Sequence, residues 1–584
     1  MASCLTSLRS RSSPVTRLSR LLSLRDRTHL HSYTPLSIPI PIPIPILARN
    51  QSSTIKMADP DPDRTYESAL RHLDSIQSNR HVTSLFSTPP PSTSSSNPPA
   101  QDLNAQAIPE MLSWLSRAGL TQASLASSRL RCIHVAGTKG KGSVCAYLTS
   151  ILLSEPAAAA GRVGTYTSPH LVSVRERIQL DGRPISRPLF AQYFFEVWDA
   201  FTASARALST SSSAPLDQQP QISEEELQGP ATKPFYFRFL TILALHAFLR
   251  EGVRSAVVEC GIGGEYDSTN ILPAESVTAS VVTRLGVDHV GMLGATVPEI
   301  AWHKAGVCKP GRKCFALRAE GEDAEDTMRV LRDRAAEKKA VLVEVDAEGS
   351  GWQSVRSETG SLEGDFQRGN QALALLAAAE HLRVLEANPD KTWPGADSES
   401  LEALSARFAT GLRSARLRGR CETLRDGSIT WFIDGAHTSE SLAETAAWFA
   451  RKYEELPNAP KPVLLFNQQE RDVAKLLGSL QEGIEKRLVL GSSAFSYAVF
   501  TRNDLRPGAA GESERDLSVQ RTAAEAMERR TRLKNTIVTD NVSEAVERIR
   551  AIQRDEGVEV VVLATGSLHL VGALLRTLEP DGEL

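Results

Sequence analysis

The 584-residue sequence is poor in cysteine and in long apolar runs. None of its seven cysteines forms a C-x-x-C pair, so we expect neither a disulfide framework nor a structural zinc site, as is usual in a reducing compartment. No stretch reaches about 18 uninterrupted apolar residues, and we therefore expect no transmembrane span. The formal net charge of −3 shows no basic excess, which argues against nucleic acid as the main partner.

The first 57 residues lack acidic side chains until Asp26 and are rich in Arg and Ser. This composition is typical of a mitochondrial transit peptide, although a disordered basic tail has the same features. The alternating Ile-Pro run over residues 38–46 breaks helical geometry and reads as an extended linker. Globular character begins at Met57, where a second start would give a cytosolic form. We expect a protein that is mitochondrial, in the matrix or associated with the inner membrane, and also cytoplasmic.

The remaining chain is long enough for two or more domains. Low-complexity segments at 87–101, 209–230 and 346–361 are expected to be surface loops. Short apolar, β-branched runs alternate with helical patterns and predict buried parallel strands in an α/β fold. These runs are Ile133–Ala136, Ala256–Glu259, Val277–Thr283, Ile429–Ile433, Pro462–Phe466 and Val558–Ala564. We place one domain at 58–415 and a second at 416–584.

The segment HVAGTKGKGS (134–143) joins a predicted strand to a helix through a glycine-rich turn. Free backbone N–H groups, the positive helix end and Lys141 together suit ATP phosphates. In the usual G-x-x-x-x-G-K-[ST] pattern a hydroxyl residue follows the lysine and holds Mg²⁺, but Gly142 stands there. Spacing alone leaves two alternatives open, a nucleotide loop and a glycine-rich turn without a ligand.

Two ionisable residues follow other predicted strands. Glu259 ends an apolar strand, where a carboxylate is costly to bury unless it is paired or bound to a cation. His289 comes just after the strand that begins at Val277, and the alternative is a loop histidine satisfied by its neighbours. Open α/β sheets bind ligands at such strand ends.

Ten segments in order resemble the folylpolyglutamate synthases, of eukaryotic and fungal type, in the Mur-ligase-like superfamily. The resemblance covers Arg64 to Gly572 and rests on RTYESALRHLDSIQSN, HVAGTKGKGS, TSPHLVSVRERIQLDGRPIS, GIGGEYDSTN, LGVDH, LEGDFQRGN, RGRCE, IDGAHTSES, LLFNQQERD and GSLHLVG. It implies a P-loop-containing Mur-ligase-like central domain with a mainly parallel sheet. A smaller Rossmann-like α/β domain is expected at the C-terminus.

The resemblance also implies the ligand set. The phosphate loop would bind ATP through Gly140, Lys141, Gly142 and Ser143. The missing hydroxyl would come from elsewhere in the chain, with Mg²⁺ held by Ser168, Glu259 and His289. Further ATP contacts are expected from Arg420 and Asp434, although Asp434 has the alternative role of a helix N-cap. Gln367 and Asn370 resemble residues near the nucleotide base.

Lys141, Lys304 and His437 are the expected catalytic residues. The lysine at the position of Lys304 is carbamylated in bacterial members of the family, where it adds a metal-binding carboxylate. His303 stands where those members have glutamate, so two interpretations remain open: a carbamylated ligand, and an ammonium that offsets phosphate charge. His437 is expected to assist the attacking amine or to orient it.

The activity implied is ATP-dependent addition of L-glutamate to the γ-carboxylate of folate, tetrahydrofolate and their polyglutamates through an acyl phosphate, giving ADP and phosphate. Mg²⁺ is the expected cofactor, a monovalent cation such as K⁺ is left open, and we expect a monomer. The folate pocket is expected between the domains, lined by Thr167–Leu171 and by aromatics of residues 233–248, which alternatively form a core helix.

Two other functions stay open at this point. One is a dihydrofolate synthase, which joins glutamate to dihydropteroate with the same phosphate loop. The other is a nucleotide-binding regulator without turnover. Retention of the complete set of lysine, metal-ligand and nucleotide residues argues against the regulator.

Overall fold

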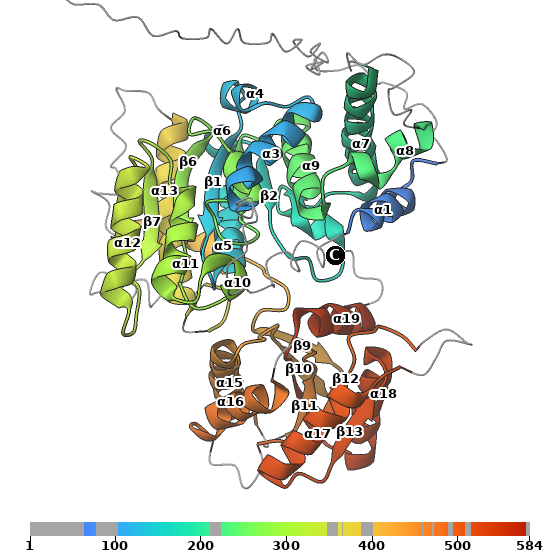
Figure 1. Ribbon diagram of the computed structural model, residues 1–584. Helices are drawn as coiled ribbons and strands as arrows, with labels where there is room; N and C mark the ends of the chain where they lie inside the picture. The colour runs from blue at the N-terminus through green and yellow to red at the C-terminus, as the bar shows by residue number, and fades with distance from the viewer. Residues whose placement is uncertain are drawn as a thin grey trace, which may run out of the picture. The chain divides into compact units, whose positions relative to one another are not determined.

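A computed structural model of the chain (Figure 1) describes ten ranges: residues 63–77, 103–210, 223–346, 360–364, 366–386, 401–457, 460–469, 472–488, 494–507 and 515–579. The predicted transit peptide, the second start at Met57 and the predicted loop at 87–101 lie outside these ranges. So do residues 347–359 of the predicted loop at 346–361.

The larger sheet has eight strands in the order β4-β3-β2-β5-β1-β6-β7-β8. Six of them run parallel, and only β3 and β4 join at one edge as antiparallel strands. The strands are β1 (Arg131–Ala136), β2 (Val163–Tyr166), β3 (Ile178–Leu180), β4 (Arg183–Pro184), β5 (Ser255–Glu259), β6 (Val277–Val282), β7 (Lys313–Leu317) and β8 (Val341–Val345). The predicted parallel sheet is confirmed.

Alternate residues of β1 pack on opposite faces of this sheet. Ile133 and Val135 join a core with α5 (Lys141–Ser154), α13 (Gln367–Glu386) and α14 (Leu401–Ser414). Cys132 joins a second core on the other face with helices α7 (Arg187–Thr210) and α9 (Tyr236–Arg250). Burial on both faces explains why the central strands read as continuous apolar runs.

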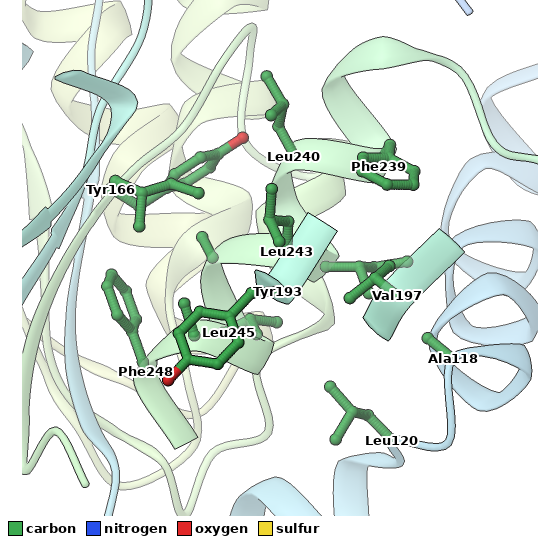
Figure 2. Packing of buried hydrophobic residues seen from close by; sticks show 14 of the residues in the cluster. Ala118, Leu120, Tyr166, Tyr193, Val197, Phe239, Leu240, Leu243, Leu245 and Phe248 are labelled. Carbon is green, nitrogen blue, oxygen red and sulfur yellow. The ribbon is translucent and has the colours of Figure 1, made fainter. Parts of the chain in front are cut away.

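The second core is largely helical and aromatic. Its helices are α1 (Tyr66–Ser75), α3 (Leu103–Arg117), α4 (Gln122–Ser127), α7 and α9. Helix α8 (Glu224–Gln228) contacts α7 outside this core. Figure 2 shows Tyr166 of β2 among residues of α7 and α9, including Tyr193, Val197, Phe239, Leu243 and Phe248. The core-helix alternative for residues 233–248 is therefore confirmed for most of α9.

The loop predicted at 209–230 is wrong for part of its length. Residues 224–228 form α8, and a 3-10 turn follows at Pro230–Thr232. The Ser223 hydroxyl accepts a hydrogen bond from the Glu226 backbone N–H, and the Glu226 carboxylate accepts one from Ser223 N–H. This capping box stabilises a helix that the acidic, polar composition did not suggest. Residues 211–222 lie outside the described ranges.

Short elements complete the larger sheet's surroundings. They are α6 (Ala157–Ala160), α10 (Val290–Leu293), α11 (Val297–Lys304) and α12 (Ala324–Glu337), with 3-10 turns η1 (Val174–Arg177), η3 (Ser268–Ile271) and η4 (Ala305–Val307). Helices α11 and α12 pack with η4 against one face near the strand ends, in a core that includes Ala136, Cys260 and Val282.

The smaller sheet has the order β13-β12-β11-β14-β10-β9, and only β9 is antiparallel. Its strands are β9 (Glu422–Asp426), β10 (Ile429–Ile433), β11 (Lys461–Phe466), β12 (Tyr497–Thr501), β13 (Thr536–Thr539) and β14 (Val560–Thr565). Helices α15 (Ser439–Glu454), α16 (Val473–Glu485) and α17 (Ser518–Thr531) cover one face. The other face carries α18 (Val542–Glu556) and α19 (Leu568–Leu578). A Rossmann-like C-terminal unit is thus confirmed.

The cysteines and the longest helices bear on two expectations from the sequence, namely that it has no disulfide framework and no transmembrane span. The six cysteines inside the described ranges are all buried and form no disulfide with one another. No helix in the same ranges is both long and apolar enough to cross a bilayer.

Candidate active site

The carboxyl ends of four neighbouring strands, β2, β5, β1 and β6, open onto one cavity of about 1490 Å³. Glu259 is the last residue of β5, and the segments that follow β2, β1 and β6 carry Ser168, the phosphate loop and His289. All of them line the cavity. Residues of the smaller α/β unit, including Arg420, Asp434 and His437, line the same space. Lys304 is the one predicted site residue that is not part of the lining.

Two glycines of the phosphate loop are required by their surroundings. Gly137 has φ +143° and Gly140 has φ +93°, a region that side chains rarely adopt. A Cβ at Gly137 would lie 1.8 Å from Thr283 Oγ1, and one at Gly140 would lie 2.3 Å from Asn370 Oδ1. At Gly142 the nearest atom to an added Cβ is Leu417 Cδ2 at 3.8 Å, so sterics do not require glycine there.

Two lysines converge beneath this loop. Lys141 Nζ donates to the Gly137 carbonyl at 3.0 Å, and Lys304 Nζ donates to the same oxygen at 2.8 Å. Lys304 is buried, and its burial, together with the Lys141 charge, lowers its pKa to about 7. Lys304 therefore supports the phosphate loop from behind.

The predicted metal ligands come from three separate segments. Ser168 N–H donates to Glu259 Oε2 at 3.0 Å, which brings the first two residues together. Glu259 is 4% exposed; burial raises the pKa of its carboxyl, while the positive charge of Lys141 opposes the rise. His289 has a left-handed backbone with φ +50° and faces the same cavity.

This donor set fits a divalent cation. A buried carboxylate is stabilised by a cation beside it, and hydroxyl, carboxylate and imidazole are all ligands of divalent metals. Within the described ranges no group of three or more His, Cys, Asp or Glu side chains is placed to hold a metal ion. The predicted set depends on the Ser168 hydroxyl as its third ligand. Asp288, whose Oδ2 lies 3.8 Å from His289 Nε2, is a cavity residue that the sequence reasoning missed.

Asp434 holds two turns of the smaller unit together. Its buried carboxylate accepts hydrogen bonds from Cys421 N–H, Ala436 N–H and the Thr445 hydroxyl, each at 2.9 Å. The N-cap alternative for Asp434 is wrong, because Thr438 caps α15. The carboxylate fixes the turn after Arg420 against the turn that carries His437.

His437 and two polar residues of α13 are oriented by local hydrogen bonds. The Gly435 carbonyl only accepts, so His437 Nδ1, 3.1 Å away, carries the hydrogen of this bond. Gln367 Nε2 donates to the Ser143 hydroxyl at 3.2 Å, and Asn370 Nδ2 donates to Gln367 Oε1 at 2.9 Å. These amides thus support the phosphate loop and also line the cavity, while their predicted place near the base stays a prediction.

The start of α9 forms an aromatic wall. Phe235 and Phe237 line the cavity, as do Thr167, Ser168, Pro169 and Leu171 of the predicted folate-binding loop. The Phe237 ring packs on Gly261, where an added Cβ would lie 2.6 Å from the ring. Residues 233–248 therefore serve mainly as core and present only their first turn to the cavity.

Fold and site together define a nucleotide-binding α/β protein of the Mur-ligase-like class. A Mycobacterium tuberculosis folylpolyglutamate synthase complexed with ADP and AMPPCP has a TM-score of 0.58 at 23% identity, covering 82% of this chain and 99% of that one. A Yersinia pestis bifunctional folylpolyglutamate synthase/dihydrofolate synthase complexed with AMPPNP and Mn ion has a TM-score of 0.55 at 19% identity, covering 88% and 98%.

Sequence similarity is stronger in a fungal relative. A Saccharomyces cerevisiae folylpolyglutamate synthase (strain FostersO) is 36% identical over 527 residues, which cover 88% of this chain and 86% of the yeast protein. The chain belongs to the folylpolyglutamate synthase family. Residues 418–577 also match the family described as "Dihydrofolate synthetase, C-terminal domain".

Proposed function

We propose that this protein is an ATP-dependent ligase that adds L-glutamate to the γ-carboxylate of folates and of their polyglutamates, with release of ADP and phosphate. The observation that carries the proposal is one cavity lined by a phosphate loop, a serine–glutamate–histidine set and nucleotide residues of a second α/β unit, in a chain of this family. Nucleotide and divalent metal are co-substrate and cofactor, in keeping with the complexes of the structural relatives.

The first half-reaction activates a poor electrophile. The folate γ-carboxylate attacks the γ-phosphorus of ATP in line, which gives an acyl phosphate and ADP. Lys141 and the N–H groups at the start of α5 offset the charge on the transferred phosphoryl group. A bound divalent ion adds to this charge stabilisation at the phosphate oxygens. Ser168, Glu259 and His289 would hold it and leave places for phosphate oxygens and water, which Mg²⁺ favours.

In the second half-reaction the amine of L-glutamate attacks the acyl carbonyl, and phosphate leaves. His437 Nδ1 donates to the Gly435 carbonyl, and in the neutral form of this tautomer Nε2 is the acceptor nitrogen. This nitrogen suits a group that accepts a proton from the glutamate ammonium, which yields the attacking amine, or that orients the amine. A His437→Ala enzyme with unchanged turnover would exclude the proton-accepting role.

For Lys304 we favour support of the phosphate loop and offset of phosphate charge. The hydrogen bond from Lys304 to Gly137 and its place outside the cavity lining support this role. The alternative of carbamylation predicts a carbamate carbon in NMR spectra of protein kept under ¹³C-labelled CO₂. A spectrum without that signal at neutral pH agrees with the favoured role.

Mg²⁺ as the resident ion, K⁺ as an additional cofactor and a monomeric state belong to the same proposal. So does location in both mitochondria and cytoplasm, supported by the basic, serine-rich leader and by Met57. N-terminal peptide sequencing of both cell fractions tests this, and a single start in both fractions would contradict it.

One assay tests the function. Purified protein receives Mg-ATP, L-glutamate and either tetrahydrofolate or dihydropteroate, and the products are read by mass. A ladder of glutamate additions on tetrahydrofolate supports the proposal. Product from dihydropteroate alone supports the second candidate, dihydrofolate synthase, which the description of the C-terminal match favours. If no ADP forms with either tetrahydrofolate or dihydropteroate, both candidate functions are contradicted.

A further inference from the structure

The phosphate loop contains a second lysine, Lys139, for which the reaction above has no role. Its ammonium lies 2.7 Å from Glu440 Oε2. Glu440 lies in the first turn of α15, directly after the turn that carries His437. Lys139 thus joins the phosphate loop to the α/β unit that supplies the other cavity residues.

Arg284 forms a parallel contact. The N–H groups of Thr138 and Lys139 both donate to the Arg284 carbonyl at 3.1 Å, so the two cationic residues are neighbours through their backbones. Arg284 Nη1 lies 2.7 Å from Glu444 Oε1, and Nη2 lies 3.2 Å from Glu320 Oε2.

The two acids that pair with Lys139 and Arg284 lie one helical turn apart on α15. Glu440 and Glu444 are four residues apart on α15 and therefore lie on the same side of the helix. Burial raises the pKa of Glu444, while Lys139 and Arg284 oppose that rise. Two neighbouring cations of the larger unit thus face two acids one helical turn apart.

Helix α15 connects these ion pairs to His437 and Asp434. Thr438, which caps this helix, follows His437 directly, and Thr445 donates to the Asp434 carboxylate at 2.9 Å. Fixing the first two turns of α15 therefore fixes both His437 and Asp434 relative to the phosphate loop.

We propose that Lys139, Arg284, Glu440 and Glu444 form an ionic clamp that positions the His437 turn over the phosphate loop. The four are positioning residues, and the clamp rests on the proposed function. Exposed ion pairs add little to folding stability, so the clamp acts on geometry. A displacement of about 1 Å in reacting groups can lower a rate by about 100-fold.

Charge exchange tests the clamp. Arg284→Glu and Glu444→Arg are each expected to lower kcat at least about tenfold, with like charges facing each other. The double variant Arg284→Glu/Glu444→Arg restores opposite charges and is expected to recover kcat to within about threefold of wild type. Lys139→Glu, Glu440→Lys and their double variant form an independent second cycle.

Two further measurements separate a positioning role from a folding defect. Thermal unfolding of each single variant is expected to match that of Arg329→Glu, a charge reversal in an exposed i,i+3 pair of α12. Small-angle scattering of the ADP complex should give a larger radius of gyration for Arg284→Glu and a wild-type radius for the double variant.

The clamp is refuted if the single variants keep wild-type kcat, or if the losses add in both double variants. Either result requires an active wild-type enzyme. A wild-type protein that adds no glutamate to any folate instead contradicts the proposed function. The scattering comparison still tests the clamp in that case.

Discussion

Replacement of Lys304 by methionine should change how the stability of the protein depends on pH. The native pKa of Lys304 is about 7, against about 10.4 for lysine in an unfolded chain. Between these values the unfolded state binds the proton that the native state has lost, so stability rises with pH. The full slope is about 1.36 kcal/mol per pH unit, and it falls to half near pH 7.

Integrated from pH 7 to pH 9, this single lysine makes the wild-type protein about 2 kcal/mol more stable. Below pH 7 both states are protonated, and the cost of burying the charge is present in full. Lys304→Met removes the titrating group while keeping a side chain of similar length. The free energy of unfolding of the variant should therefore lack this rise with pH. The variant should exceed wild type in stability by the largest margin at low pH.

The assay is urea unfolding at pH 6, 7, 8 and 9, followed by tryptophan fluorescence, for both proteins. Lys233 and Lys309 have native pKa values lowered by burial to about 8, but both proteins retain them. The difference between the two pH profiles thus isolates Lys304. Parallel profiles from pH 7 to pH 9 would refute the argument from burial.

Three further predictions concern the cavity. Gly140→Ala should raise KM for ATP at least about tenfold, because the added Cβ would lie 2.3 Å from Asn370 Oδ1. The control Gly427→Ala, at φ +59° with no atom within 4 Å, should lower the free energy of unfolding by only about 1 kcal/mol. Equal KM values for ATP in the two variants would contradict the prediction. Asp434→Asn should lower kcat/KM for ATP at least about tenfold, since an amide nitrogen replaces one oxygen that now accepts hydrogen bonds. Steady-state kinetics that match wild type would show that the turn carrying His437 does not need the carboxylate. His437→Gln should lower kcat more than KM for glutamate if the ring accepts a proton, whereas a rise in KM alone would indicate orientation only.

Six strands, β1, β5, β6, β10, β11 and β14, were predicted because central parallel strands are buried on both faces, and the other strands were not. Ala256 to Val258 are apolar without interruption before Glu259, and Ile429 to Ile433 are apolar except for Thr430 and are followed by Asp434. This local signal needs no knowledge of the fold. Glu259 stood out for the same reason, as a carboxylate at the end of such a run. The helix at 224–228 was missed because its stability comes from a capping box, while composition favoured a loop.

Other features depend on contacts between distant parts of the chain. The Lys139–Glu440 pair joins residues 301 positions apart, and no local pattern marks either partner. Lys304 was expected either to be carbamylated or to offset phosphate charge, and its hydrogen bond to the Gly137 carbonyl could not be foreseen from either interpretation. The three donors to Asp434 come from Cys421, which precedes β10 in the chain, and from Ala436 and Thr445, which follow it. The sequence alone does not reveal that they meet. The metal set and nucleotide residues came from family resemblance, and the structure places all of them along one cavity.

The proposed chemistry requires one divalent ion that Ser168, Glu259 and His289 hold jointly. Titration of Mn²⁺ into the ADP-bound protein, followed by electron paramagnetic resonance, measures this binding without turnover. Ser168→Ala, Glu259→Gln and His289→Gln should each weaken Mn²⁺ binding at least about tenfold relative to wild type. Wild-type affinity in all three variants would contradict the shared site.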